Sequence, residues 1–353
     1  MRKIQNNIVL NTEYKNNIKY IIEAFINLYK SSNKNEKDFK NFEKENQKQN
    51  IYNQRERHNY FLKMTNKIIK EYQKELKRNN QIDYHDMINI AIKIVKRKKI
   101  HQYKYIFIDE YQDISLNKIL LIKEIQKQTN AKLVAVGDDF QSIYSFTGSN
   151  IEVIKNFKKY FDKAKIKKLR NTYRNSLELL KITQNFICKN PYQIKKKLKS
   201  KIRNDYPITI YYYLKDEEKV WKKILSDAKA EKLLVLGRNN NDEASIPHNN
   251  KIKYLTIHKS KGLETETTII INLENKYNSL PNKIKDSEYL TYVKTKEEKF
   301  KYAEERRLFY VALTRCKKNN ILIVKKDNPS IFVKELLKDS KNNIKIIDTT
   351  LEK

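Results

Sequence analysis

The chain has 353 residues, and its 75 Lys and Arg against 42 Asp and Glu give a formal net charge of +33 at pH 7. Two distant cysteines without a CxxC pattern argue against a disulfide scaffold or a zinc cluster, and with no apolar run of 18 residues and no signal-peptide core we expect a cytoplasmic protein without a membrane partner. The charge favours a polyanionic partner, although the Lys-rich, Asn-rich and Gly-poor composition indicates that part of the surplus is a bias of the whole sequence.

The first hundred residues carry apolar side chains at three- and four-residue spacings, which predicts helices over 17–30 and 60–78. A further helix is expected to begin after Asp83, a suitable N-cap with Asp86 three residues later. The intervening polar stretch, 31–50, fits either a solvated helix or a mobile linker. We therefore expect a helical segment over 1–100.

After residue 100, short runs of β-branched and aromatic residues alternate with helical patterns, which predicts an α/β fold with parallel sheets covered on both faces. The expected strands are 103–109, 131–137, 208–214, 232–237, 253–258, 267–273 and 320–324. Several end in polar residues, and ligands of open α/β sheets bind at that edge. The run 159–171 is expected to cross between two such domains.

Five polar blocks follow in order: DEYQD (109–113), VGDDFQSIYSFTGS (136–149), TYRN (172–175), TIHKSKGLE (256–264) and EERRLFYVALTR (304–315). Each block alone could be a solvated turn or an amphipathic helix. Together they resemble motifs II to VI of the superfamily 1 DNA helicases of the UvrD/Rep type. Within that family, GDDFQSIYSFTGS looks closest to helicase IV, and the resemblance spans roughly residues 80–338.

The resemblance implies two RecA-like parallel-sheet domains, the first N-terminally incomplete, with ATP and Mg²⁺ as cofactors and 3′ to 5′ translocation on single-stranded DNA. It implies four parts. Residues 1–100 would be a helical remnant of an insertion in the first domain, 101–163 the rest of that domain with motifs II and III, 164–338 the second domain with motifs IV to VI, and 339–353 a tail.

The resemblance also assigns catalytic roles. Asp109 would hold Mg²⁺ through water, and Glu110 would orient and deprotonate the attacking water. Gln141 would sense the γ-phosphate, and Arg174 and Arg315 would act as arginine fingers, because a guanidinium matches a phosphoryl group. For the nucleoside, Tyr173 would stack on adenine and Glu264 would accept a hydrogen bond from ribose.

A second set of residues would face DNA or link the two activities. Phe146, with Tyr144 beside it, would stack on a base, a contact worth about 1–3 kcal/mol. The other expected DNA contacts are Lys259, Ser260, Arg238 and Asn240, although a solvated loop explains the last two equally well. Coupling roles would fall to Asp113, Asp138 and His258, with His258 bridging to the carboxylates of motif III.

The sequence also departs from the family pattern. The phosphate loop GxxxxGK[ST] needs glycines, and no glycine precedes Gly137. Ser145 and Thr147 stand where many relatives have arginines. Three interpretations stay open: a carboxyl-terminal helicase part completed by a second polypeptide with the Walker A half, an inactive truncated remnant, or a non-enzymatic single-stranded-DNA-binding or regulatory protein.

Overall fold

A computed structural model describes residues 12–98, 102–161, 164–227, 232–294 and 298–351. The chain divides into two compact units. The first comprises 1–138, 144–163 and 286–297, and the second comprises 139–143, 164–285 and 298–353. The chain therefore exchanges two short segments, because 139–143 packs in the second unit and 286–297 in the first.

The first unit begins with four helices, α1 (Thr12–Ser31), α2 (Glu36–Gln47), α3 (Tyr52–Arg78) and α4 (Tyr84–Arg97). Asp83 caps α4 as predicted, and its side chain accepts the Asp86 N–H at 2.8 Å. The polar stretch after α1 is helical, and α2 buries Phe39 and Phe42 against Phe25. Two aromatic residues thus turn a solvated-looking helix into part of a core.

Within the exchanged segment, residues 286–294 complete this helical core. Its 3-10 turn (Glu288–Tyr292) stacks Tyr289 on Phe61, with ring centroids 4.3 Å apart. The hydroxyl of Tyr292 lies 2.7 Å from Nδ1 of the buried His58. Aromatic packing and a buried hydrogen bond therefore hold this segment in the helical unit.

The rest of the first unit is a two-stranded parallel sheet, β1 (Tyr105–Ile108) and β2 (Lys132–Ala135), joined by α5 (Leu116–Thr129). Two short helices, α6 (Ile151–Lys155) and α7 (Phe157–Tyr160), follow. One sheet face contributes Ile108, Leu133 and Ala135 to a core that includes Ile119 of α5. The opposite face, where Phe107 is in register with Val134, is exposed.

The second unit is built on a six-stranded parallel sheet in the order β5-β4-β6-β7-β3-β8. Its strands are β3 (Ile208–Tyr213), β4 (Leu233–Gly237), β5 (Ile252–Thr256), β6 (Thr265–Ile270), β7 (Cys316–Lys325) and β8 (Ile344–Asp348). The first five strands match the predicted runs. Strand β8 lies in the segment expected to be a tail, and it pairs with β3 at the sheet edge.

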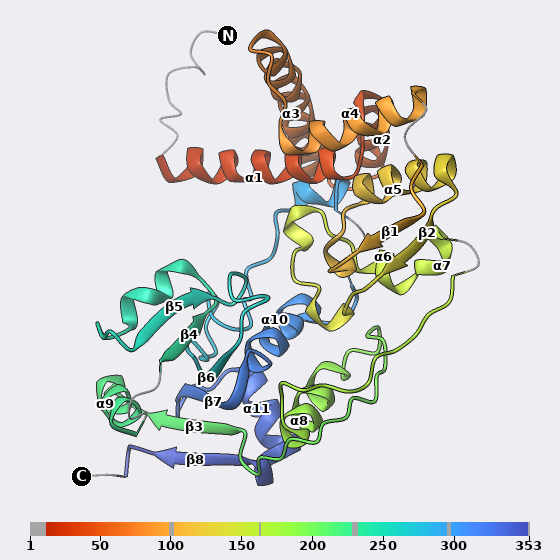
Figure 1. Cartoon of the computed structure of the whole chain (residues 1–353). Coiled ribbons are helices and arrows are strands. Elements are labelled where there is room, and N and C mark those ends of the chain that lie inside the picture. Colours follow the sequence, from red (N-terminus) through yellow and green to blue (C-terminus); the bar gives the residue numbers. More distant parts are fainter. Residues whose placement is uncertain (1–11, 99–101, 162–163, 228–231, 295–297, 352–353) are drawn as a thin grey trace, which may run out of the picture. The chain divides into compact units, whose positions relative to one another are not determined.

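Helices cover this sheet through apolar side chains on alternating strand positions. On α9 (Glu217–Asp227), Val220 and Trp221 join a core with Val235 of β4. The other helices are α8 (Leu177–Ile187), α10 (Ala303–Leu313) and α11 (Ile331–Ser340) (Figure 1). They meet through the rings of Phe186, Phe309 and Phe332. None of the helices in the described part of the chain could span a bilayer.

Candidate active site and nucleic-acid interface

The two carboxylates of motif II follow β1 directly and are both exposed. Glu110 has a φ of 48°, in the left-handed region that non-glycine residues seldom occupy, and its N–H donates to Asp109 Oδ1 at 2.8 Å. Such strain is typical of functional sites. The turn therefore presents both carboxylates at the carboxyl end of the strand.

Gln112 is a positioning residue that the sequence did not single out. It is fully buried, its amide N–H donates to Glu110 Oε2, and its Oε1 accepts the Asp138 N–H at 2.8 Å. A Cβ on Gly137 would lie only 2.8 Å from that same Oε1, so glycine is needed there. Gln112 thus connects Glu110 to the end of β2. The glycine at position 137 is the feature of the sequence that reflects this close contact.

The described residues hold no group of three or more His, Cys, Asp and Glu placed to bind a metal ion. Mg²⁺ bound with a nucleotide needs only one or two protein carboxylates, because phosphate and water oxygens complete its shell. The exposed Asp109 fits that modest requirement. It does not make a metal site by itself.

The predicted DNA-stacking pair lies in the same unit. Phe146, in the 3-10 turn Ser145–Thr147, is 54% exposed, and its ring meets the Tyr144 ring edge-on at 5.9 Å. Burial raises the pKa of Tyr144, with smaller contributions from Asp113 and Glu110. An exposed ring therefore stands on a half-buried one whose hydroxyl is close to the motif II carboxylates.

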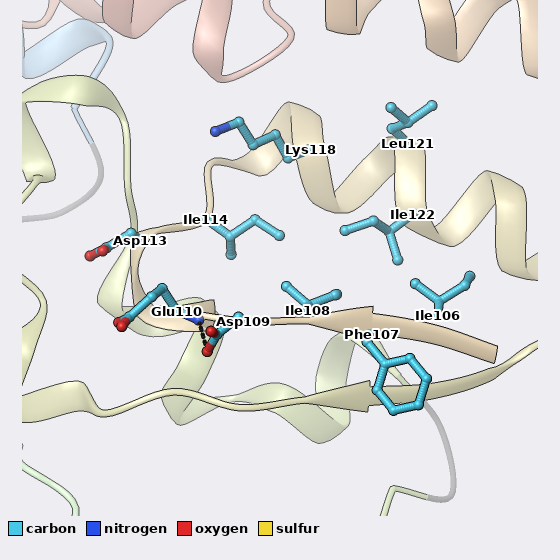
Figure 2. A pocket seen from close by; sticks show the side chains of 10 residues that line it. All are labelled: Ile106, Phe107, Ile108, Asp109, Glu110, Asp113, Ile114, Lys118, Leu121 and Ile122. Atoms are coloured by element: carbon cyan, nitrogen blue, oxygen red, sulfur yellow. Dashed lines mark hydrogen bonds between the residues drawn. The ribbon is translucent and has the colours of Figure 1, made fainter. Parts of the chain in front are cut away.

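A groove of about 540 Å³ runs along β1 and α5 to these carboxylates (Figure 2). Its apolar lining includes Ile106 and Phe107 from the strand and Ile122 from the helix. Asp109, Glu110 and Asp113 stand at one end. The groove joins an exposed apolar surface to the polar end of the strand.

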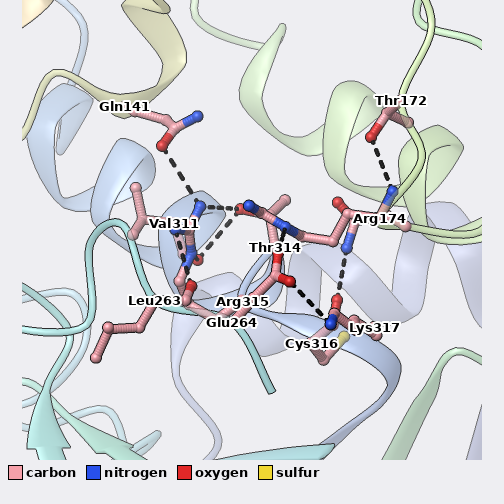
Figure 3. A network of polar contacts seen from close by, with 11 residues as sticks. Gln141, Thr172, Arg174, Leu263, Glu264, Val311, Thr314, Arg315, Cys316 and Lys317 are labelled. Atoms are coloured by element: carbon pink, nitrogen blue, oxygen red, sulfur yellow. Dashed lines mark hydrogen bonds and ion pairs between the residues drawn. The ribbon is translucent and has the colours of Figure 1, made fainter. Parts of the chain in front are cut away.

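The second unit brings Gln141 and Arg315 together (Figure 3). Arg315 is 1% exposed, and its Nη2 donates to Gln141 Oε1 at 3.4 Å, while its Nε donates to the Val311 carbonyl at 3.1 Å. Lys261 Nζ donates to the carbonyl of Gln141 at 2.8 Å. Two residues predicted to face the γ-phosphate are thus adjacent although 174 positions separate them.

Arg174 and Glu264 form the neighbouring pair in Figure 3, with Arg174 Nε donating to Glu264 Oε2 at 2.8 Å. Lys317 Nζ lies 2.8 Å from the other oxygen of Glu264. Hydrogen bonds from Lys317 and Arg174 lower the pKa of Glu264. Tyr173 next to them is 86% exposed, so its ring is open for stacking.

The Gln141 segment is anchored on both sides by residues of the second unit. Asp139 is fully buried, with Lys196 Nζ 2.5 Å from its Oδ1 and the Ile194 N–H donating to its Oδ2 at 2.8 Å. Arg307 Nε donates to the Ser142 carbonyl at 2.6 Å. Lys196 was not predicted to take part, and the burial of Asp139 was not predicted either, because a buried aspartate and a solvated one look alike in sequence.

The predicted coupling histidine touches motif III through the main chain. His258 hydrogen-bonds the backbone of Ile143, and burial lowers the pKa of His258 to about 4, helped by the charge of Arg238. His258 is therefore neutral at pH 7. One partner of His258 is thus a peptide group of motif III, and the predicted bridge to the motif III carboxylates stays a prediction.

The other residues predicted to contact DNA differ in their exposure and in their partners. Lys259 and Asn240 are exposed, and Lys259 Nζ donates to Asn240 Oδ1 at 3.5 Å. The prediction for Ser260 needs correction, because its side chain is buried and donates to the Ile257 carbonyl at 2.8 Å. Arg238 binds Glu305 through Nε and Nη2, both at 2.9 Å, so a structural role explains it.

Comparisons with known proteins agree with these motifs. Residues 2–162 match the family model of the UvrD/REP helicase N-terminal domain. The chain is 32% identical to DNA helicase IV of Escherichia coli over 288 residues, covering 79% of this chain and 42% of that protein. It is 34% identical to the ATP-dependent DNA helicase Rep of Buchnera aphidicola over 47% of this chain and 27% of that protein. It is 32% identical to the ATP-dependent DNA helicase PcrA of Bacillus subtilis over 45% of this chain and 22% of that protein.

The chain is thus an α/β protein with helicase motifs at its strand ends. It belongs to the UvrD/Rep family of superfamily 1 helicases. It spans less than half the length of each of these relatives.

Proposed function

We propose that this chain is the motif II to motif VI part of a UvrD/Rep-type, ATP-dependent 3′ to 5′ DNA translocase, and that it needs a separate polypeptide carrying the Walker A loop to hydrolyse ATP. The observation that carries the proposal is the pairing of Gln141 with Arg315, next to Arg174 and Glu264. Mutations accumulating in an inactive gene remnant would not preserve that cluster. Its parts come from four distant segments of the chain.

In the proposed reaction, residues of several motifs take separate roles. Asp109 would hold Mg²⁺, which screens the charge of the phosphates when bound. Glu110, fixed by Gln112, would orient the attacking water and take its proton. Arg174 and Arg315 would neutralise charge that develops on the γ-phosphoryl group.

Nucleotide binding in this proposal changes the partners of the second half-site. Glu264 is ion-paired with Arg174 and Lys317. A γ-phosphate would compete with that carboxylate for the guanidinium of Arg174, which would leave Glu264 able to accept a hydrogen bond from ribose. Tyr173, being exposed, would stack on adenine without rearrangement.

The exposed sheet face of the first unit supports the proposal that a second polypeptide binds there. Parallel sheets occur almost always with both faces covered, yet Tyr105, Phe107, Val134 and Val136 are 54%, 75%, 43% and 53% exposed. Among the described residues, β1 pairs only with β2. The groove along β1 therefore offers an open edge and an apolar floor to an added strand and helix.

The test is ATP hydrolysis by the purified chain with saturating single-stranded DNA, alone and with the product of a neighbouring gene that encodes GxxxxGK[ST]. We expect negligible hydrolysis by the chain alone and DNA-stimulated hydrolysis by the pair. Robust hydrolysis by the pure chain, abolished by Glu110→Gln, would refute the need for a second polypeptide. Absence of any single-stranded DNA binding at low salt would instead favour an inactive remnant.

A further inference from the structure

Two lysine-rich segments of the second unit run side by side. Four of the eight residues in 164–171 and six of the ten in 194–203 are Lys or Arg, and neither segment contains an acidic residue. The whole chain has 75 Lys and Arg in 353 residues together with 42 acidic residues. The general composition therefore explains neither the density of positive charge nor the lack of negative charge. We call residues 165–170 and 195–203 the basic ribbon.

Main-chain hydrogen bonds join the two segments. The Lys199 N–H donates to the Arg170 carbonyl at 2.7 Å, and the Thr172 N–H donates to the Lys199 carbonyl at 2.9 Å. Lys168 Nζ also donates to the Lys195 carbonyl at 2.9 Å. These contacts tie two segments that lie 30 positions apart in the sequence.

The second segment alternates between exposed and inward-facing residues. From Lys195 to Lys201 the exposed positions are every second residue and all are basic: Lys195, Lys197, Lys199 and Lys201. Arg203 continues the row beside Ile202, which is 40% exposed. The residues between the four lysines are partly buried, and Lys196 points inward to Asp139. In extended chain a two-residue step is about 6.6 Å. The exposed cations therefore form a regular row.

The row is held in place and has little negative charge to neutralise it. Lys196 anchors it through its ion pair with the buried Asp139 and through the Phe140 ring, whose centroid lies 4.1 Å from Nζ. Of the exposed row, Arg203 alone has a described acidic partner, Glu178 at 3.1 Å. The described residues place no carboxylate within ion-pair distance of the other four.

We propose that the basic ribbon is a binding site for the phosphodiester backbone of a nucleic acid, separate from the helicase motifs. The like charges of the row repel one another. This repulsion decreases when a polyanion binds and replaces the small counterions. A linear row at regular spacing fits a linear polymer of phosphates better than a single phosphate group. Because the inward-facing Lys196 fixes the segment, little ordering cost remains to be met on binding.

An anionic membrane is the main competing ligand. Ile166 and Leu169 of the first segment are 56% and 83% exposed, and apolar side chains beside cations can also insert into a bilayer surface. The four lysines of the alternating row, however, have no exposed apolar residue between them, since Leu198 is partly buried. The row itself therefore favours a polymer backbone.

The experiment measures single-stranded DNA binding by fluorescence anisotropy at increasing salt without ATP. The ribbon variant carries Lys195→Gln, Lys197→Gln, Lys199→Gln and Lys201→Gln. Each lost phosphate contact should reduce the slope of log K against log salt by about 0.7, or about 2.8 in all. The difference in affinity loss between wild type and variant would be about 50-fold from about 50 to about 200 mM salt.

The matched control removes the same charge elsewhere in the same unit, with Lys215→Gln, Lys219→Gln, Lys334→Gln and Lys345→Gln. These four lysines are exposed and have no ion pair among the described residues. The control should keep the wild-type slope within about one phosphate contact, or about 0.7. Thermal melts of both variants should match that of the wild type, because all eight positions are exposed.

Equal slopes in the two variants would overturn the proposal, because only net charge would then matter. It would also be overturned if the ribbon variant kept its DNA slope but lost binding to phosphatidylserine vesicles. ATP hydrolysis does not enter the readout. A failure of the proposed translocase therefore leaves this test unaffected.

Discussion

Strand β4 of the second unit and strand β1 of the first are both runs of apolar residues, yet all of β4 is buried while Tyr105 and Phe107 of β1 are 54% and 75% exposed. The difference lies in their neighbours. Strand β4 has a strand on each side, whereas within the described part of the chain β1 pairs with β2 alone. The second unit thus buries its strand β4 among its own residues, whereas in the described part of the first unit one face of the two-stranded sheet is exposed.

The largest effect is expected at the carboxylates that end the incomplete sheet. In the complex with the Walker A polypeptide, Glu110→Gln should lower the rate of ATP hydrolysis by at least about 100-fold, because it removes the general base. The measurement is steady-state phosphate release with saturating DNA. The exposed Glu152→Gln is the control and should retain the wild-type rate. If the rate of Glu110→Gln stayed within a few-fold of wild type, Glu110 would not be the general base.

The contrast between the two sheets predicts a contrast in stability. Leu236→Ala in β4 should lower the free energy of unfolding of the second unit by about 2–5 kcal/mol, because it empties a fully buried site. Phe107→Ala in β1 should change stability by less than about 0.5 kcal/mol, as exposed positions do. Denaturant unfolding followed by circular dichroism measures both. Equal losses would mean that the β1 face is covered in solution.

The ion pair between Lys196 and Asp139, which holds the Gln141 segment, should contribute nearly as much to the stability of the second unit. Lys196→Met keeps the aliphatic stem but leaves the buried Asp139 without its cation, at a cost of about 3 kcal/mol. Lys197→Met, at the exposed position next to it, should cost less than about 0.5 kcal/mol. Hydrogen exchange of residues 139–143 should accelerate in the first variant only. Similar exchange rates of residues 139–143 in both variants would show that the ion pair of Lys196 with Asp139 does not hold this segment in the second unit.

A smaller, pH-dependent effect is expected at His258. Its pKa is about 4 in the folded protein and 6.5 in the reference state, so the unfolded chain binds the extra proton between these values. Stability should therefore fall as the pH is lowered from about 6.5 to about 4, by at most about 3 kcal/mol. His258→Gln should flatten this part of the profile. Parallel wild-type and variant profiles would show that His258 is accessible to protons.

Much of the fold could be predicted because its strands are short and almost continuously apolar. The edge strand β8 was missed because its Lys345 and Ile346 are both exposed, so that no alternation or apolar run marks it. The helix α2 looked solvated because Phe39 and Phe42 are its two apolar residues, and the third residue it buries, Asn46, is polar. Edges and half-buried helices depend on their neighbours in space more than on their own pattern.

The site shows the same division. The residues with chemical roles could be named from motifs, but their supporting contacts could not. Gln112 lies inside DEYQD, and only the buried hydrogen bonds to Glu110 and Asp138 identify it as a positioning residue. Ser260 lies inside the motif V match, and a tight turn returns its hydroxyl to the Ile257 carbonyl. Long-range hydrogen bonds and local turn geometry leave few marks in one sequence.

The central claim is that a Walker A polypeptide completes the two-stranded sheet, and its direct test is the affinity of that polypeptide for the chain. Phe107→Asp should weaken binding at least about 10-fold, because a carboxylate would be buried in an apolar interface. Tyr277→Asp is the control, since Tyr277 in the second unit is 76% exposed, and it should bind as the wild type does. Isothermal titration calorimetry of the three proteins decides the matter. Equal affinities for all three would contradict the account.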